Sequence, residues 1–260
     1  SITSGALDAA ANRLAHLLAD LGVQRGQVVG LYLHRSIEMV VGILATMKLG
    51  AAYAPQHVGV APADALRHIA NITGAQVLLT LSSLQHMIPV EEDHHKLICI
   101  DDVMKDQTIP DTGAPDGPLY TLHPEDRAMV LFTSGTTGVP NGVQVTHKNL
   151  CNVLQTKPGN LGMRPGLRVG QILSIAFDMA AWETLGALSN GATLVIRGKS
   201  IVETAKTVDI LIATPSILNT LDVAHCQQMK VVAVAGEPCP RPLADTWSGF
   251  GPFYNSCGPA

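Results

Sequence analysis

The chain has 260 residues, with 17 Lys or Arg against 21 Asp or Glu, so its formal net charge is −4. That balance excludes the large basic surface that a phosphate backbone needs, and we expect no nucleic-acid partner. Hydrophobic residues make up 47% of the chain and charged residues 15%, which excludes disorder and indicates that part of the surface is covered by something outside these residues.

The apolar runs are short, and none approaches the roughly 20 residues of a membrane span. The first residues show no basic start followed by an apolar stretch, so no secretory signal is visible. Five cysteines form no C-x-x-C pair, which is typical of free thiols. These features predict a cytoplasmic protein without a membrane partner.

Amphipathic helical patterns alternate with apolar strands through the first half of the chain. Residues 4–21 carry Leu and Ala at steps of three and four before Gly22, which predicts a helix and its stop. The pattern continues as strand 28–33, a helix from the capping Ser36 to Leu49, strand 51–55, helix 61–72, and strands 76–81 and 96–100. Wholly apolar strands between such helices favour a parallel sheet covered on both faces.

A segment rich in Pro, Gly and Asp, 109–124, reads as an exposed connection. We therefore predict two α/β subdomains, 1–118 and 119–260, each with a mainly parallel sheet flanked by helices. The second would hold strands 127–133, 171–175, 192–196, 209–213, 230–235 and 252–255, with helices 146–156, 178–189, 215–221 and 240–248.

The most informative stretch is LFTSGTTGVPNGV, from Leu131 to Val143. A buried strand leads into glycines, threonines and a serine, so backbone N–H groups and hydroxyls are offered together to an anion such as phosphate. A flexible turn is the alternative reading. Neither a Walker A loop nor G-x-G-x-x-G occurs, and a nucleotide-binding module of another kind stays open here.

Two other candidate sites are weaker. His94 and His95 follow Glu91–Asp93 and could ligate a metal, but a charged run before a strand is usually a solvated loop. Cys239 has no histidine placed by the sequence to activate it, so an inert thiol is expected. No metal site is predicted.

The glycine-rich segment resembles the phosphate loop of the adenylate-forming superfamily, which includes acyl-CoA synthetases, luciferases and the adenylation domains of nonribosomal peptide synthetases. Further segments resemble family motifs in the same order: LDAAANRLA (7–15), MKLGAAYAP (47–55), AFDMAAWE (176–183), AGE (235–237) and YNSCGP (254–259). F-D-x-x-x-W-E is the form found in amino-acid-activating members. Residues 54–57 and 235–242 resemble fungal synthetases, including those that make hydroxamate siderophores.

The resemblance implies that an amino acid and ATP form aminoacyl-AMP and pyrophosphate, and that the acyl group is passed to a carrier-protein thiol. It implies ATP and Mg²⁺, phosphopantetheine on the carrier, and carrier and condensation domains as partners. The implied ATP-binding residues are Thr133, Ser134, Gly135, Thr136, Thr137, Gly138, Gly236, Glu237, Cys257 and Gly258. The implied amino-acid pocket comprises Asp178, which would hold the α-ammonium, with Met179, Trp182, Ser216, Ala233, Ala235 and Ser256.

The chain departs from the family pattern at three points. Asn141 stands where a lysine is usual, Cys257 replaces the aromatic on which adenine stacks, and Ala260 stands at the threonine before the Mg²⁺-binding glutamate. The ribose-binding aspartate and the lid with its catalytic lysine would follow these residues, so we expect the 260 residues alone to be inactive. A degenerate domain serving as a non-catalytic platform is the alternative.

Simpler roles stay open for three of these residues. Asp178 stands where the N-cap of helix 178–189 would be, and Trp182 could belong to the core. Asn141 could be a turn residue before Gly142.

Overall fold

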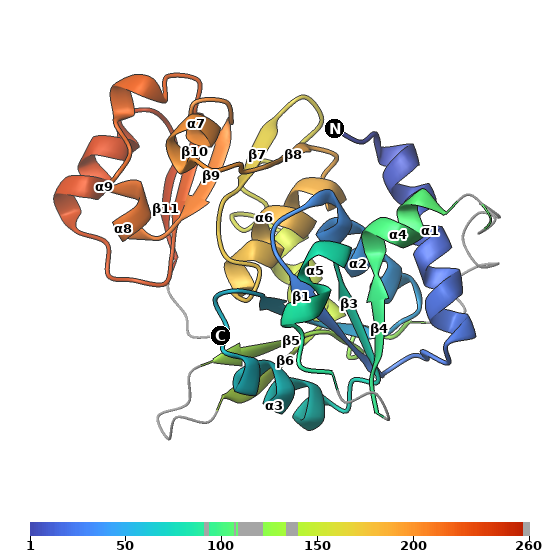
Figure 1. The fold of residues 1–260 in the computed structure, drawn as a ribbon. Coiled ribbons are helices and arrows are strands. Elements are labelled where there is room, and N and C mark those ends of the chain that lie inside the picture. The colour runs from blue at the N-terminus through green and yellow to red at the C-terminus, as the bar shows by residue number, and fades with distance from the viewer. Residues whose placement is uncertain (91–93, 107, 109–121, 134–139, 257–260) are drawn as a thin grey trace. The chain divides into compact units, whose positions relative to one another are not determined.

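The computed structural model describes residues 1–90, 94–106, 108, 122–133 and 140–256. The chain divides into two compact units, Ser1–Leu150 and Cys151–Ala260. Each unit holds a mostly parallel sheet flanked by helices, which confirms the predicted fold class (Figure 1). The division falls beyond the predicted boundary between 118 and 119, because two further strands of the chain join the first sheet.

The first unit is built on a six-stranded sheet of order β4-β3-β1-β2-β5-β6 in its described part. Neighbouring strands run parallel except β5 and β6, which form an antiparallel hairpin. The strands are β1 (Val28–Leu33), β2 (Ala52–His57), β3 (Val77–Thr80), β4 (Lys96–Cys99), β5 (Arg127–Thr133) and β6 (Asn141–Thr146).

Helices cover both faces of this sheet. Those of the first unit are α1 (Ser4–Asp20), α2 (Ile37–Lys48), α3 (Ala63–Thr73), the 3-10 turn η1 (Ser82–Met87) and α4 (Ile100–Lys105), and α5 (His147–Gln155) crosses into the second. Helix α2 covers the face of the sheet that carries Leu31 and Leu79, because a Cβ added to Gly42 of α2 would touch both side chains. On the other face Tyr32 donates its hydroxyl hydrogen to the carbonyl oxygen of Leu66 in α3, 2.8 Å away.

The base of the β5–β6 hairpin is tied to the turn before β1. The Arg25 guanidinium donates to both carboxylate oxygens of Asp126, at 2.9 and 2.7 Å. The backbone N–H of His123 donates to Asp126 as well, at 2.7 Å, and the guanidinium of Arg127 donates to the Gly26 carbonyl. These contacts fix the end of the hairpin that lies opposite the predicted phosphate loop.

Stability should therefore depend on pH through Asp126. The Arg25 hydrogen bond, then that of His123, lowers the pKa of this carboxyl to about 2. A carboxyl whose pKa is depressed on folding stabilises the fold above its ordinary pKa, and that contribution disappears as pH falls through the depressed value. Asp126→Asn should lower the melting temperature at pH 6, and the difference from the parent should close between about pH 4 and pH 2.

Glu125→Gln is the matched control, because Glu125 is exposed and pairs only at the surface with Lys148. It should change the melting temperature little at any pH. A gap for Asp126→Asn that stays constant down to pH 2 would contradict the assignment.

The second unit is built on a five-stranded parallel sheet of order β11-β10-β9-β7-β8 in the part that is described. Its central strand β9 has no exposed surface at any residue. The strands are β7 (Arg168–Gln171), β8 (Thr193–Ile196), β9 (Ile210–Ala213), β10 (Val231–Val234) and β11 (Phe253–Asn255). The helices are α6 (Asp178–Ser189), α7 (Ile201–Ala205), α8 (Pro215–Leu218), the 3-10 turn η2 (Val223–His225) and α9 (Arg241–Ser248).

Several local predictions differ from the structure. Strand β6 and helices α4 and α7 were not predicted, and β7 ends at Gln171, before most of the predicted strand 171–175. The apolar pattern in this segment comes from burial outside a strand. The connection after β7 buries Ile172, Leu173 and Ile175.

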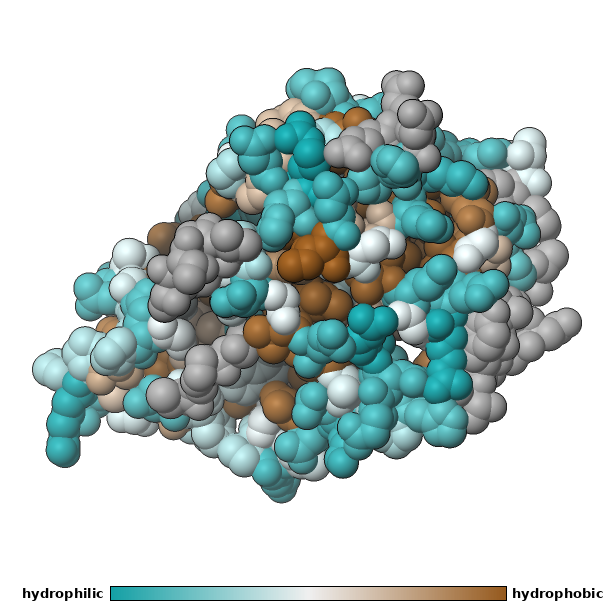
Figure 2. Space-filling view, turned by 90° about the horizontal axis from the view of Figure 1, so that it is seen from below, coloured by the Kyte–Doolittle hydropathy of each residue, from teal (hydrophilic) through white to brown (hydrophobic). Residues whose placement is uncertain are grey.

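No helix in the described ranges is long and apolar enough to cross a membrane. Four cysteines, Cys99, Cys151, Cys226 and Cys239, are free thiols. The surface seen in Figure 2 is largely hydrophilic, with apolar side chains showing between the polar ones.

Candidate functional site

The segments that carry the predicted pocket residues meet at one edge of the second sheet. Because β7, β9, β10 and β11 are parallel, the residues that follow them leave the sheet at the same edge. Two hydrogen bonds join these segments: Ala235 N–H donates to the Ala213 carbonyl at 3.2 Å, and Ser256 N–H to the Val234 carbonyl at 2.8 Å. This edge is the candidate site.

Asp178 is the first residue of α6 at this edge. Its Oδ1 accepts a hydrogen bond from the Met179 N–H at 2.8 Å, and the residue is exposed. The N-cap position belongs to Phe177, whose side chain makes no capping bond, so the N-cap role considered for Asp178 is wrong. A carboxylate in the first turn still favours the helix, because the N-terminal end of the macrodipole is positive.

Met179 and Gly236 bring α6 and the segment after β10 together. Gly236 has φ +85°, and a Cβ added there would lie 3.8 Å from Met179 Sδ and 3.8 Å from Thr214 Cγ2. Gly236 and Met179, predicted for ATP and amino acid respectively, are thus neighbours.

Trp182 is half-buried and packs against the core of the second unit. Its indole Nε1–H donates to the Gly159 carbonyl at 2.6 Å, so its polar group is already engaged. Trp182 would therefore offer a ligand only its ring surface.

Ser216 and Glu237 hold each other across the ends of β9 and β10. The Ser216 N–H and hydroxyl both donate to Glu237 Oε2, at 3.0 and 2.5 Å. These two bonds lower the pKa of Glu237, with a smaller contribution from Thr214. Glu237 therefore stays ionised near neutral pH and braces Ser216, in addition to any contact it makes with a nucleotide.

The remaining predicted pocket residues differ in exposure. Ala233 lies within β10 and has no exposed surface, whereas Ala235 and Ser256 are half-buried at the strand ends. Ala233 would thus act from beneath the pocket surface.

The predicted phosphate loop falls largely outside the described residues, which exclude Ser134, Gly135, Thr136, Thr137 and Gly138, and also Cys257 and Gly258. Thr133 ends β5 and pairs with Asn141, the first residue of β6, so Asn141 belongs to a strand and is not a turn residue.

Sequence reasoning missed a buried polar network behind Asp178. Glu183 and Gln171 have no exposed surface and are hydrogen-bonded to each other. A possible signal was present: between Ala180 and Ala187 of α6, Glu183 is the only charged residue.

Among the described residues no three His, Cys, Asp or Glu side chains are grouped so that they could hold a metal ion. Glu91–Asp93 lie outside those residues. The site as described thus does not by itself fit Mg²⁺.

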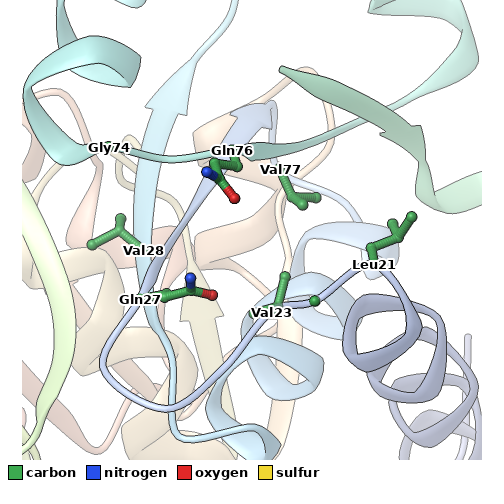
Figure 3. A pocket seen from close by; sticks show the side chains of 8 residues that line it. Leu21, Val23, Gln27, Val28, Gly74, Gln76 and Val77 are labelled. Carbon is green, nitrogen blue, oxygen red and sulfur yellow. The ribbon is translucent and has the colours of Figure 1, made fainter. Parts of the chain in front are cut away.

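The first unit has a pocket at the amino ends of β1 and β3 (Figure 3). Two glutamines face it among aliphatic side chains, and Gln27 Oε1 already accepts from the Gln24 N–H at 2.8 Å. The lining residues are Leu21, Gly22, Val23, Gln27, Val28, Gly74, Gln76 and Val77. Since ligands of such folds bind at the carboxyl ends of strands, it is not the candidate site.

Comparison with known proteins identifies relatives of this chain. Two adenylate-forming reductases of Coprinopsis cinerea are 40% and 41% identical to this chain over 100% and 99% of it. The nonribosomal peptide synthetase aclP of Aspergillus oryzae is 34% identical over 99% of it. The chain spans 25% of each reductase and 16% of the synthetase.

A solved structure shares the fold. The N-terminal subdomain of Klebsiella oxytoca NpsA, in complex with 3-hydroxybenzoyl-AMSN, superposes with a TM-score of 0.83 at 22% identity, covering 99% of this chain and 66% of that one. The profile of the AMP-binding enzymes matches residues 1–260. The expected superfamily is thus confirmed, and the chain belongs to the family of AMP-binding enzymes.

Proposed function

We propose that this chain is the substrate-binding portion of an enzyme that activates an amino acid as its adenylate. In the reaction a carboxylate oxygen of the amino acid attacks the α-phosphorus of ATP, a P–O bond forms, and pyrophosphate leaves. The observation that carries the proposal is Asp178, whose exposed carboxylate stands at the start of α6 beside Met179, where strand ends meet. A carboxylate placed there can pair with the α-ammonium and exclude acids that lack one.

The other residues at this edge shape the pocket. Met179, Ser216, Ala235 and Ser256 are uncharged, and the Ser216 hydroxyl is already donated to Glu237. Ser216 can therefore accept a hydrogen bond from a substrate side chain but has no free hydroxyl hydrogen to donate. ATP would be held by the loop after Thr133 and by the segment at Gly236.

The fate of the adenylate distinguishes two candidates. In peptide synthesis the aminoacyl group passes from the adenylate to the phosphopantetheine thiol of a carrier domain, and a condensation domain acts next. The match to peptide synthetases suggests this fate. The higher identity to adenylate-forming reductases favours instead a carrier-bound thioester that accepts hydride from a nicotinamide cofactor, giving an aldehyde and a free thiol. Both begin with the same adenylation.

Pyrophosphate exchange by the full-length protein tests the first step. In the presence of at least one amino acid, the protein should exchange labelled pyrophosphate into ATP. The panel of amino acids includes the N-hydroxylated amino acids of hydroxamate siderophores. The matching acid that lacks the amine should support exchange that is slower by a factor on the order of 100. Equal exchange with both acids would refute amine recognition. No exchange with any acid would favour the non-catalytic platform, and aldehyde formed from a carrier-bound acid would favour the reductase.

A further inference from the structure

The segment that delivers Asp178 to the site is fixed from within by one buried carboxylate. Glu183, on the second turn of α6, has no exposed surface. Its Oε1 accepts from the Ile172 N–H at 2.9 Å and from the Leu173 N–H at 3.2 Å. Its Oε2 lies 3.3 Å from the Leu173 nitrogen and accepts from Gln171 Nε2 at 3.1 Å.

These bonds join the last residue of β7 and the two after it to the helix that follows. Gln171 Nε2 also donates to the Leu173 carbonyl at 3.0 Å, so the first residues of the connection are held from two sides. Its far end is closed by the Phe177 N–H, which donates to the Ser174 carbonyl at 3.1 Å. Glu183 therefore ties α6, which begins at Asp178, to the end of β7.

A carboxylate is a costly way to satisfy backbone groups of a connection. Burying a charge is unfavourable unless hydrogen bonds compensate for the lost water. Proteins place a charged residue at an apolar core position mostly where a functional site requires a fixed geometry. Two carboxylate oxygens can hold neighbouring N–H groups and an amide together, which a hydroxyl cannot do.

We propose that Glu183 is a positioning residue for amino-acid recognition: it holds the connection between β7 and α6 so that Asp178 meets the substrate ammonium. The inference rests on the proposed function. Glu183 touches no substrate in this scheme and acts only through the connection and the helix.

Glu183→Gln in the full-length protein is the central test. The amide keeps the shape, and its oxygen can still accept from the Ile172 and Leu173 N–H groups, but its NH₂ cannot accept from Gln171 Nε2 and places two donors against each other. We expect the KM for the amino acid in pyrophosphate exchange to rise at least 10-fold while the KM for ATP changes less than threefold. Amide hydrogen exchange should become faster within 172–180 and stay unchanged in β9 and β10. Glu203→Gln is the matched control, because Glu203 is exposed on α7 and pairs only with Lys206.

The double variant with Asp178→Asn separates positioning from general damage. If Glu183 acts through Asp178, adding Glu183→Gln to Asp178→Asn should change the remaining exchange rate less than twofold. Independent losses in the two variants would overturn the proposal, as would a Glu183→Gln enzyme with a lower melting temperature and an unchanged KM for the amino acid.

Failure of the proposed function has a different signature. It would appear in the parent protein, as exchange that does not require an amine or no exchange at all. In that case faster amide exchange within 172–180 of Glu183→Gln would still establish the bracing contact, but not its role toward an ammonium, and the proposal would fall.

Discussion

Asp178→Asn in the full-length protein should abolish most amino-acid-dependent pyrophosphate exchange while leaving ATP binding nearly unchanged. The amide preserves the shape and hydrogen bonding of the side chain but removes its negative charge. Bound substrate displaces water from the site, and its ammonium group then has no opposite charge to pair with. Removing one partner of such a pair costs about 2–5 kcal/mol. That corresponds to a loss in kcat/KM of roughly 30-fold to 5,000-fold.

The structure supplies the control for this substitution. Asp178 uses Oδ1 to accept from the Met179 N–H, and the Oδ1 of asparagine can accept the same bond. The start of α6 should therefore survive, and the melting temperature should stay close to that of the parent. A stable and fully active Asp178→Asn enzyme would show that Asp178 serves only the helix, and the substrate would then be a carboxylic acid without a required amine.

Local patterns predicted most elements because local physics determines them. Ser36 accepts a hydrogen bond from the Met39 N–H at 3.1 Å and so starts α2 where a capping residue was expected. Helix α6 has the predicted bounds, 178–189. The strands β1, β5 and β8 also fall within about a residue of their predicted ranges.

Long-range pairing determined what was missed. Strand β6 lies in a segment whose glycine and proline suggested a loop, and it is a strand because it pairs with β5. Tyr53 of β2 in turn pairs with Met129 of β5, which draws that hairpin into the first sheet and moves the division between the units. Periodicity within a segment carries no information about such partners.

The same distinction applies to the site. Motif resemblance selected Asp178, Met179 and Gly236, and the structure places the last two so that a Cβ added to Gly236 would lie 3.8 Å from Met179 Sδ. The sequence signals that Glu183 is unusual but not what it binds, because its acceptor function depends on where β7 ends. The bond between Ser216 and Glu237 likewise joins segments 21 residues apart whose meeting depends on the pairing of β9 with β10.

The largest stability effect is expected in β9, the strand that leads to Thr214 and Ser216. Leu211 has no exposed surface, and a Cβ added to Gly170 of β7 would lie 3.3 Å from its Cδ1. Leu211→Ala should lower the free energy of unfolding of the second unit by about 2–5 kcal/mol, because it removes buried methyl groups and leaves a cavity. Both tryptophans of the chain, Trp182 and Trp247, lie in this unit, so denaturant unfolding followed by fluorescence measures the loss.

Two further variants test whether the loss comes from this contact. Val202→Ala on α7 is the exposed control and should change the free energy by less than about 0.5 kcal/mol. Gly170→Ala should be unfavourable in the parent, where its Cβ crowds Leu211. In the Leu211→Ala background the tightest contact of that Cβ is gone and the next nearest atoms, in Val208 and Ile172, lie at 3.5 and 3.7 Å, so the same change should restore part of the lost stability. If the stability losses of Leu211→Ala and Gly170→Ala simply add, β7 and β9 do not pack through these two residues. That result would also contradict the strand register that aligns the segments bearing Asp178 and Ser216 at one edge.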